Sequence, residues 1–125
     1  MKTTVTKVFT FDAAHLLVNY HGPCANMHGH TYKLEVTLYS EKGILNQGML
    51  MDFTDVKKVV SDIILDKVDH KILNEVLPCP TTAECMAEYF FTRLDNYLSD
   101  TNLQGIRVDK IRLWETPTSY AEVIR

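Results

Sequence analysis

The sequence predicts an α+β domain built around an antiparallel sheet. Two segments near the N-terminus alternate apolar and polar residues, which is the period of a half-buried strand. In the middle of the chain the apolar residues change to the three-and-four spacing of amphipathic helices, and the C-terminal segments return to the strand pattern. The order of strands, two helices and strands is typical of an antiparallel sheet with helices on one face.

The two N-terminal strands are predicted from residues of equal parity, because successive side chains of a strand point to opposite faces. The apolar residues of the first strand are Val5, Phe9, Phe11 and Ala13. Residues 31–39 alternate more clearly, and the apolar set is Tyr32, Leu34, Val36 and Leu38. The residues between them, Lys33, Glu35 and Thr37, are polar. We expect the apolar sets to face the core.

Turn residues and a short apolar run separate these strands from the helices. Residues 41–43 (EKG) and 46–48 (NQG) are typical of turns. The run 49–51 (MLM), which ends before Asp52, predicts an extra short strand or hairpin arm.

The first predicted helix runs from Phe53 to about Lys67, and the second begins after Pro80, where Thr81 and Glu84 have the spacing of a capping box. The apolar face of the first helix consists of Val56, Val59, Val60, Ile63 and Ile64. The apolar face of the second consists of Met86, Ala87, Phe90, Phe91, Leu94, Tyr97 and Leu98. A polar break at 99–105 precedes two further predicted strands, 106–115 and 119–125.

Length and composition limit the classes of function. The chain of 125 residues is sized for a single domain, 1–125, with its own core. Its net charge of −3 provides no basic field for nucleic acid or for an anionic membrane surface. The N-terminal segment lacks the pattern of a secretory leader, and no apolar stretch approaches the roughly 18 residues of a membrane span. The 3 cysteines show no C-x-x-C spacing, so we expect a reducing, cytoplasmic location.

A sheet covered by helices on one face leaves open edges. Pairing of edges between copies of the chain satisfies their backbone groups. We therefore expect a homo-oligomer.

The densest chemical signal lies in residues 15–30 (HLLVNYHGPCANMHGH). His28 and His30 begin the second strand with equal parity, and His15 ends the first strand and lies beside them if the two strands pair. Three nitrogen ligands without a fourth from the protein are typical of a catalytic zinc, which keeps one position for water or substrate. The alternative is that His28 and His30 are hydrogen-bonded turn residues and His15 is a satisfied core histidine. The trio together favours zinc.

Cys24 lies four positions before His28, where a nearby cation favours the thiolate and makes the sulfur a usable base or nucleophile. The alternatives are a fourth zinc ligand or a buried apolar residue. Cys79 and Cys85 fit a packing role better. For His21 an exposed loop position is favoured over a phosphate contact or a spare ligand.

Two further sites contain carboxylates. Asp69 precedes His70 and can fix its tautomer if the two side chains pair, although neighbours in sequence need not pair in space. Glu115 shares parity with Ile111 and Leu113, so its carboxylate faces either the buried side of the sheet or the solvent just beyond its edge. A buried Glu115 needs donors, which a ligand with a planar pair of N–H groups would supply.

Six blocks carry a family resemblance, in order and over nearly the whole chain. The blocks are Phe9-Thr-Phe-Asp-Ala-Ala-His15-Leu, Cys24 with three residues before His28-Gly-His30, Gly48 with Met51-Asp52-Phe53, Asp69-His70-Lys-Ile-Leu-Asn74, Pro80-Thr-Thr-Ala-Glu84 and Trp114-Glu115-Thr116. Together they resemble the 6-pyruvoyltetrahydropterin synthase family. The short loop between His15 and Cys24 is most similar to the bacterial 6-carboxytetrahydropterin synthases of the 7-deazaguanine (queuosine) pathway. Cys85 is a departure, because the family often has Asn there, and it puts in doubt a local contact at the helix start.

The resemblance implies a fold, an assembly and a set of roles. The fold is a T-fold subunit, with a four-stranded antiparallel sheet and two helices between its strand pairs, assembled as a homotrimer or homohexamer with active sites at subunit interfaces. The implied roles are Zn²⁺ on His15, His28 and His30, Cys24 as the proton-abstracting base, Asp69 and His70 as its acid/base partners, and Glu115 as the pterin anchor.

The implied reaction is that of a lyase. It converts 7,8-dihydroneopterin triphosphate to 6-carboxy-5,6,7,8-tetrahydropterin with loss of acetaldehyde and triphosphate. The chain shows no Gly-rich dinucleotide fingerprint, and none is required.

Several alternatives remain open. The nearest is the 6-pyruvoyl product branch, which uses the same residues. The branch that makes 6-hydroxymethyldihydropterin typically has Glu in place of Cys24, which argues against it. Outside pterin chemistry, the three histidines could serve a zinc hydrolase or a non-enzymatic, zinc-stapled oligomeric binding module.

Overall fold

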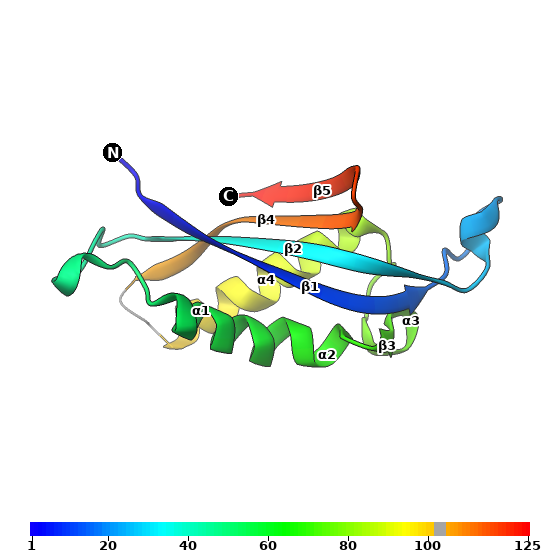
Figure 1. Ribbon diagram of the computed structural model, residues 1–125, viewed down its shortest axis with the longest axis horizontal. Coiled ribbons are helices and arrows are strands. Elements are labelled where there is room, and N and C mark those ends of the chain that lie inside the picture. Colours follow the sequence, from blue (N-terminus) through cyan, green and yellow to red (C-terminus); the bar gives the residue numbers. More distant parts are fainter. Residues whose placement is uncertain (102–104) are drawn as a thin grey trace.

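The computed structural model describes residues 1–101 and 105–125, and its centre is a twisted five-stranded sheet with helices on one face (Figure 1). The strands are β1 (Thr4–His15), β2 (His28–Ser40), β3 (Lys71–Ile72), β4 (Ile106–Thr116) and β5 (Ser119–Ile124). Their order across the sheet is β3-β1-β2-β4-β5. β1, β2, β4 and β5 are antiparallel neighbours, which confirms the α+β class.

The sheet has one strand more than the predicted four, because the two-residue β3 pairs parallel with β1. His70 precedes β3 with a left-handed backbone (φ 60°), and its N–H donates to the carbonyl oxygen of Asp12 over 2.7 Å. This turn places the chain beside β1. The parity of apolar residues does not reveal so short a strand.

The strand or hairpin arm predicted at 49–51 is wrong. Residues 46–48 form the 3-10 turn η2 (Asn46–Gly48), and Gly48 has a positive φ of 75°. The N–H of Leu45 donates to the carbonyl of Met49 over 3.2 Å. The backbone groups of this segment therefore pair locally instead of with the sheet.

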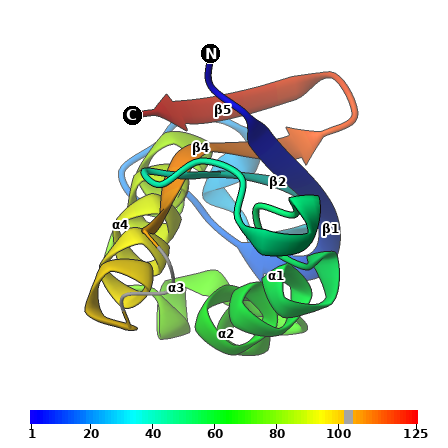
Figure 2. The same cartoon turned by 90° about the vertical axis from the view of Figure 1, so that its left-hand side faces the viewer.

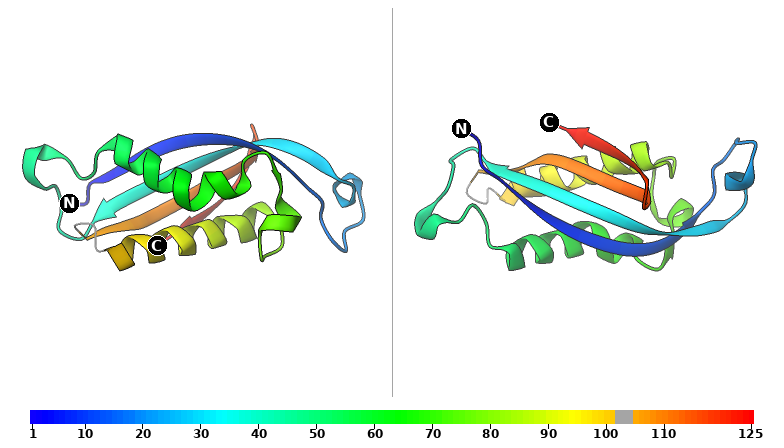
Figure 3. Two further views of the ribbon diagram at one scale, coloured as in Figure 1. Left: turned by 90° about the horizontal axis from the view of Figure 1, so that it is seen from below. Right: turned by 45° about the horizontal axis from the view of Figure 1, so that its top comes forward.

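The helices form a single layer on one face of the sheet, as the end-on view of Figure 2 and the view from below in Figure 3 show. The first long helix consists of α1 (Phe53–Val60), a π-helical turn η3 (Ser61–Leu65) and α2 (Asp66–Val68), close to its predicted span. The short α3 (Leu73–Val76) and the long α4 (Ala83–Thr101) follow. α4 extends into the predicted polar break at 99–105, of which 102–104 lie outside the described residues.

The predicted cap of α4 is wrong by one residue. The N–H of Cys85 donates to the hydroxyl oxygen of Thr82 over 3.2 Å, which makes Thr82 the cap. The hydroxyl of Thr81 instead donates to the carbonyl oxygen of Leu16 over 3.2 Å. Thr81 thus contacts the end of β1, and this contact bears on the site described below.

The core lies between the sheet and the two long helices, as the alternation predicted. Its buried members in β2 are Tyr32, Leu34, Val36 and Leu38, and those in the first long helix are Val56, Val60, Ile64 and Val68. Those in α4 include Met86, Ala87, Phe90, Leu94 and Leu98. Tyr97, which was predicted in this set, is 38% exposed.

α4 also buries a charged residue that the sequence pattern does not reveal. Asp95, 8% exposed, accepts hydrogen bonds from Arg107 at 3.1 and 2.5 Å and from the N–H of Val108 at 2.9 Å, and it pairs with Arg125. Burial alone would raise the pKa of Asp95, but the bonds from Arg107, Arg125 and Val108 lower it to about 2. The carboxylate therefore joins α4 to β4 and to the last residue of the chain.

Among the described residues, two edges of the sheet stay open. β3 covers β1 only at Ala13 and Ala14, and β5 is the last strand on the other side. Unpaired edges of this kind favour pairing with another chain. Among the described residues, no helix is both long and apolar enough to cross a membrane.

Candidate metal centre

Three histidines meet where β1 ends and β2 begins. The register pairs His15 with His28 and Ala13 with His30, which confirms the expected neighbourhood of the two strands. The ring centroids lie 4.6 Å (His15 to His28), 5.2 Å (His15 to His30) and 4.8 Å (His28 to His30) apart. One ligand atom of each ring lies within 4.8 Å of those of the other two.

Backbone carbonyls fix the tautomers of two of these rings. Nδ1 of His15 lies 2.9 Å from the carbonyl oxygen of Thr81, and Nδ1 of His28 lies 2.7 Å from that of Asn26. Because a carbonyl oxygen only accepts, each Nδ1 carries the hydrogen and each Nε2 keeps its lone pair. Metal-binding histidines are typically oriented by such bonds.

The Nε2 atoms of all three histidines are buried and have no hydrogen-bond partner among the described residues. A buried lone pair without a donor is costly unless a ligand fills the role. Three converging imidazole nitrogens with no carboxylate or thiolate in the cluster suit Zn²⁺ with an open coordination position. The residues therefore fit the predicted cofactor.

The protonation of the site is consistent with this donor set. Burial lowers the pKa of His15, against the opposing effects of the Thr81 hydrogen bond and the charge of Glu115. Burial also lowers the pKa of His30, again against Glu115. The neutral forms of His15 and His30 are therefore favoured at neutral pH, and only a neutral ring binds a metal.

The segment after His15 is held by side chains from α3 and from the approach to α4. The amide of Asn74 accepts from the N–H of Leu16 at 3.0 Å and donates to its carbonyl at 3.1 Å, and Thr81 donates to the same carbonyl. Reasoning from residue chemistry alone missed this function of Asn74 and Thr81. The only signal was their place in two of the resembling blocks.

Glu115 lies beside the histidines on the inner face of β4. Its Oε1 is 3.6 Å from Nε2 of His30, and its side chain is 28% exposed, between the two predicted alternatives. No Arg or Lys of the described residues forms an ion pair with it. Part of its carboxylate thus remains free to accept from a ligand.

Asp69 and His70 pair in space as well as in sequence. Nδ1 of His70 lies 2.9 Å from Oδ1 of Asp69, and that carboxylate also accepts from the N–H of Asp12 at 3.0 Å. The His70 side chain is 78% exposed. His70 borders a hollow of about 520 Å³ whose lining includes His30. Asp12, which was not singled out from the sequence, binds both members through its backbone.

Cys24 lies in the loop that begins after His15 and ends before His28. It belongs to the 3-10 turn η1 (Pro23–Ala25), and its carbonyl accepts from the N–H of Leu17 at 2.8 Å. The loop projects past the end of the sheet, at the right of Figure 1. Within the described chain the Cys24 thiol is not part of the histidine cluster or of the Asp69–His70 cluster.

The other two cysteines lie apart from these groups. The thiol of Cys79 is 3.9 Å from the carbonyl oxygen of Cys85, and burial, with Cys85 nearby, raises the pKa of Cys79. A raised thiol pKa disfavours the reactive thiolate. This agrees with the packing role predicted for Cys79.

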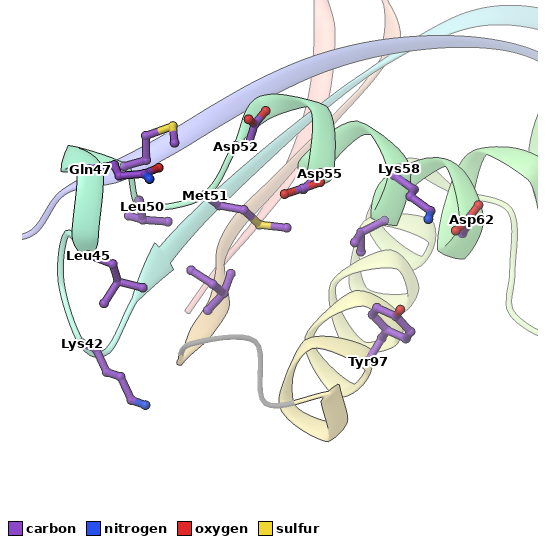
Figure 4. Close-up of a pocket in the computed structure, with 13 residues that line it drawn as sticks. Lys42, Leu45, Gln47, Leu50, Met51, Asp52, Asp55, Lys58, Asp62 and Tyr97 are labelled. Carbon is purple, nitrogen blue, oxygen red and sulfur yellow. The ribbon is translucent and has the colours of Figure 1, made fainter.

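A larger cavity of about 890 Å³ lies at the opposite end of the sheet, between the 41–52 loop, α1 and α4 (Figure 4). Its wall mixes apolar side chains with Lys42, Asp55, Lys58 and Asp62. No metal-ligating cluster of the described residues lies there. The chemistry of the chain therefore concentrates at the histidine end.

Comparisons with known proteins agree over almost the whole chain. Residues 4–125 match the sequence profile of the family described as 6-pyruvoyl tetrahydropterin synthase. The chain is 37% identical to the 6-carboxy-5,6,7,8-tetrahydropterin synthase of Haemophilus influenzae, over 94% of this chain and 96% of that one. It is 34% identical to the dihydroneopterin monophosphate aldolase of Pyrococcus furiosus, over 92% and 91%. The structure of Caenorhabditis elegans 6-pyruvoyl tetrahydropterin synthase superimposes with a TM-score of 0.82 at 28% identity, covering 100% of this chain and 96% of that one.

Proposed function

The chain belongs to the 6-pyruvoyl tetrahydropterin synthase family, and from this premise and the three converging Nε2 atoms we propose that it is a zinc-dependent lyase acting on a pterin. Its fold is the predicted T-fold, with β3 added to the four expected strands. The observation that carries the proposal is the buried, unpartnered Nε2 triad, since a purely structural role would leave these lone pairs unsatisfied.

We propose 7,8-dihydroneopterin triphosphate as the substrate and 6-carboxy-5,6,7,8-tetrahydropterin, acetaldehyde and triphosphate as the products, a step of 7-deazaguanine (queuosine) biosynthesis. The name of the Haemophilus influenzae relative supports this product over the 6-pyruvoyl alternative. Cys24 also argues against the 6-hydroxymethyl branch, in which Glu is typical at that position.

The side chains have separate tasks in this reaction. His15, His28 and His30 would hold Zn²⁺, which when bound would supply Lewis acidity toward the vicinal hydroxyls of the substrate side chain. Glu115 accepts the 2-amino and N3–H hydrogens of the pterin in a fork, which fixes the ring. Cys24 removes a proton from the side-chain carbon as thiolate.

The Asp69–His70 pair moves the second proton. Because Asp69 holds Nδ1 of His70 at 2.9 Å, Nε2 is the atom that exchanges the proton with the substrate. The exposure of His70 leaves Nε2 accessible to a ligand on the hollow beside β1.

An oligomer with interface active sites is part of the proposal. Within one chain Cys24 and the Asp69–His70 pair both lie outside the histidine cluster, and two sheet edges are open. Edge pairing between copies, as a trimer or a hexamer, would bring groups of neighbouring subunits to one substrate.

Incubation of the zinc-loaded protein with 7,8-dihydroneopterin triphosphate tests the function. We expect 6-carboxy-5,6,7,8-tetrahydropterin and acetaldehyde by mass spectrometry. A 6-pyruvoyl product would assign the rival branch, and absence of any pterin product from folded, metallated protein would refute the proposal. If the Cys24→Ala variant keeps the wild-type turnover rate, Cys24 is not the base of the reaction. A carboxylate near the metal would then be the expected base, as in a zinc hydrolase.

Glu115→Gln tests the pterin anchor. Loss of the charge-assisted fork is expected to weaken substrate binding by about 1–3 kcal/mol, or about 5- to 150-fold in KM, while the zinc content stays unchanged. Steady-state kinetics and metal analysis measure both effects. Glu88→Gln, on the exposed face of α4, is the control and should match the wild type. An unchanged KM for Glu115→Gln would remove Glu115 from the binding site.

A further inference from the structure

Tyr32 carries a fourth unpartnered polar atom at the metal centre. Its side chain is 0% exposed, and its hydroxyl has no hydrogen-bond partner among the described residues. A buried hydroxyl without a hydrogen-bond partner destabilises the fold. The neighbouring Leu34 and Phe11 show that an apolar side chain is compatible with this layer of the core, so the hydroxyl needs an explanation of its own.

The ring of Tyr32 forms the floor of the histidine cluster. It follows His30 by two residues on the same face of β2, and its centroid lies 5.5 Å from that of His30 and 6.1 Å from that of His15. Both contacts are edge-to-face, at 73° and 82°. Beneath it, Phe11 stacks on the ring at 4.9 Å and 10°. The ring is thus fixed against two of the three candidate ligands.

Two ring N–H donors of the cluster are already used. Nδ1 of His15 and Nδ1 of His28 donate to backbone carbonyls. The register of β2 with β4 pairs Lys33 with Trp114, so the next position along places Glu115 across from Tyr32. Glu115 only accepts when ionised. A hydroxyl oxygen that enters the cluster therefore finds an acceptor in Glu115 and, in the phenol of Tyr32, a buried O–H donor that has no partner among the described residues.

We propose that Tyr32 is a positioning residue of the metal centre. Its hydroxyl donates a hydrogen bond to the oxygen atom, of water or of a substrate hydroxyl, that enters beside the three Nε2 atoms. This inference rests on the proposed zinc site. It makes the centre selective for ligands that offer an oxygen acceptor, and it gives the buried phenol a partner only when the site is filled.

Tyr32→Phe removes the oxygen and keeps the ring and its stack on Phe11. If the proposal holds, the difference in stability between Tyr32→Phe and the wild type depends on whether zinc is bound. The metal-free variant should be at least as stable as the wild type, because an unpaired buried polar atom is removed. With excess zinc the variant should gain less stabilisation than the wild type, because its zinc affinity should fall about 10-fold, the lower end of the effect of an outer-shell partner.

The experiment compares the wild type with Tyr32→Phe in three measurements. Thermal melts with a chelator and with excess zinc give the stability of the two forms. Competition against a chromophoric chelator gives the zinc affinity, and the absorption spectrum of the Co²⁺-substituted protein reports the coordination of the metal. Tyr39→Phe is the control, because Tyr39 is on the same strand but contacts Lys2 and Arg125 instead of the cluster. We expect a lower zinc affinity and shifted Co²⁺ bands for Tyr32→Phe alone.

Equal zinc affinity and identical Co²⁺ bands in Tyr32→Phe and wild type would overturn the inference and leave the zinc site intact. Failure of the wild type to bind zinc or Co²⁺ would overturn the proposed function, together with the inference that depends on it. None of these readouts requires turnover, so the two failures are distinguishable.

Discussion

Replacement of His30 by Ala is expected to lower the zinc affinity by about 10²- to 10³-fold and to abolish turnover. Zinc binding by four ligands is worth about 10–16 kcal/mol, so each ligand contributes about 3–4 kcal/mol. The two histidines left in the variant cannot satisfy the coordination of Zn²⁺. The fold should persist, because the core residues of β2 lie beyond His30 on the strand. Isothermal titration with zinc and the product assay measure the two losses.

His21→Ala is the matched control. His21 lies in the loop between β1 and β2, is exposed and does not belong to the histidine cluster. The His21→Ala variant should bind zinc with the affinity of the wild type. Wild-type zinc affinity in the His30→Ala variant would contradict the assignment of His30 as a zinc ligand. If a chelator dissociates the oligomer of the wild type, a zinc-stapled binding module is favoured over a catalytic centre.

The histidine cluster was predictable because it depends on strand parity. Side chains of equal parity share a face, and adjacent strands joined by one loop pair in a hairpin. These two rules bring His15 to His28 and His30 without knowledge of the rest of the fold. The buried sets of β2, α1 and α4 followed from the same periodicities.

Contacts between distant segments were not predictable in this way. Thr81 contacts Leu16 instead of capping α4, and β3 exists because one backbone turn at His70 meets Asp12. Each depends on where one element docks on another, which no local pattern records. For the same reason, the sequence pattern did not predict that the Asn74 amide binds the backbone of Leu16. The relation of Cys24 to the Asp69–His70 pair stays a prediction, since in the proposed oligomer it would depend on neighbouring copies of the chain.

The largest effect on stability is expected at Asp95, which no motif indicated. Asp95→Asn should lower the free energy of unfolding at pH 7 by about 2–3 kcal/mol, since the charge that pairs with Arg107 and Arg125 is lost while the shape is kept. Chemical denaturation at pH 7 measures the difference. Asp100→Asn, on the exposed end of the same helix, should change the stability by less than about 0.5 kcal/mol.

The pH dependence of the free energy of unfolding tests independently whether the ionised Asp95 carboxylate is stabilising. The pKa of Asp95 is about 2 in the folded chain, against 3.8 for the free side chain. Because the folded value is depressed, the stabilisation is fully present above about pH 4–5 and is lost as the pH falls through 3.8 toward 2. The stability gap between wild type and Asp95→Asn should therefore narrow over this interval, since Asn does not titrate. A gap that stays constant down to pH 2 would mean that the ionised carboxylate does not hold α4 to β4 and the C-terminal residue.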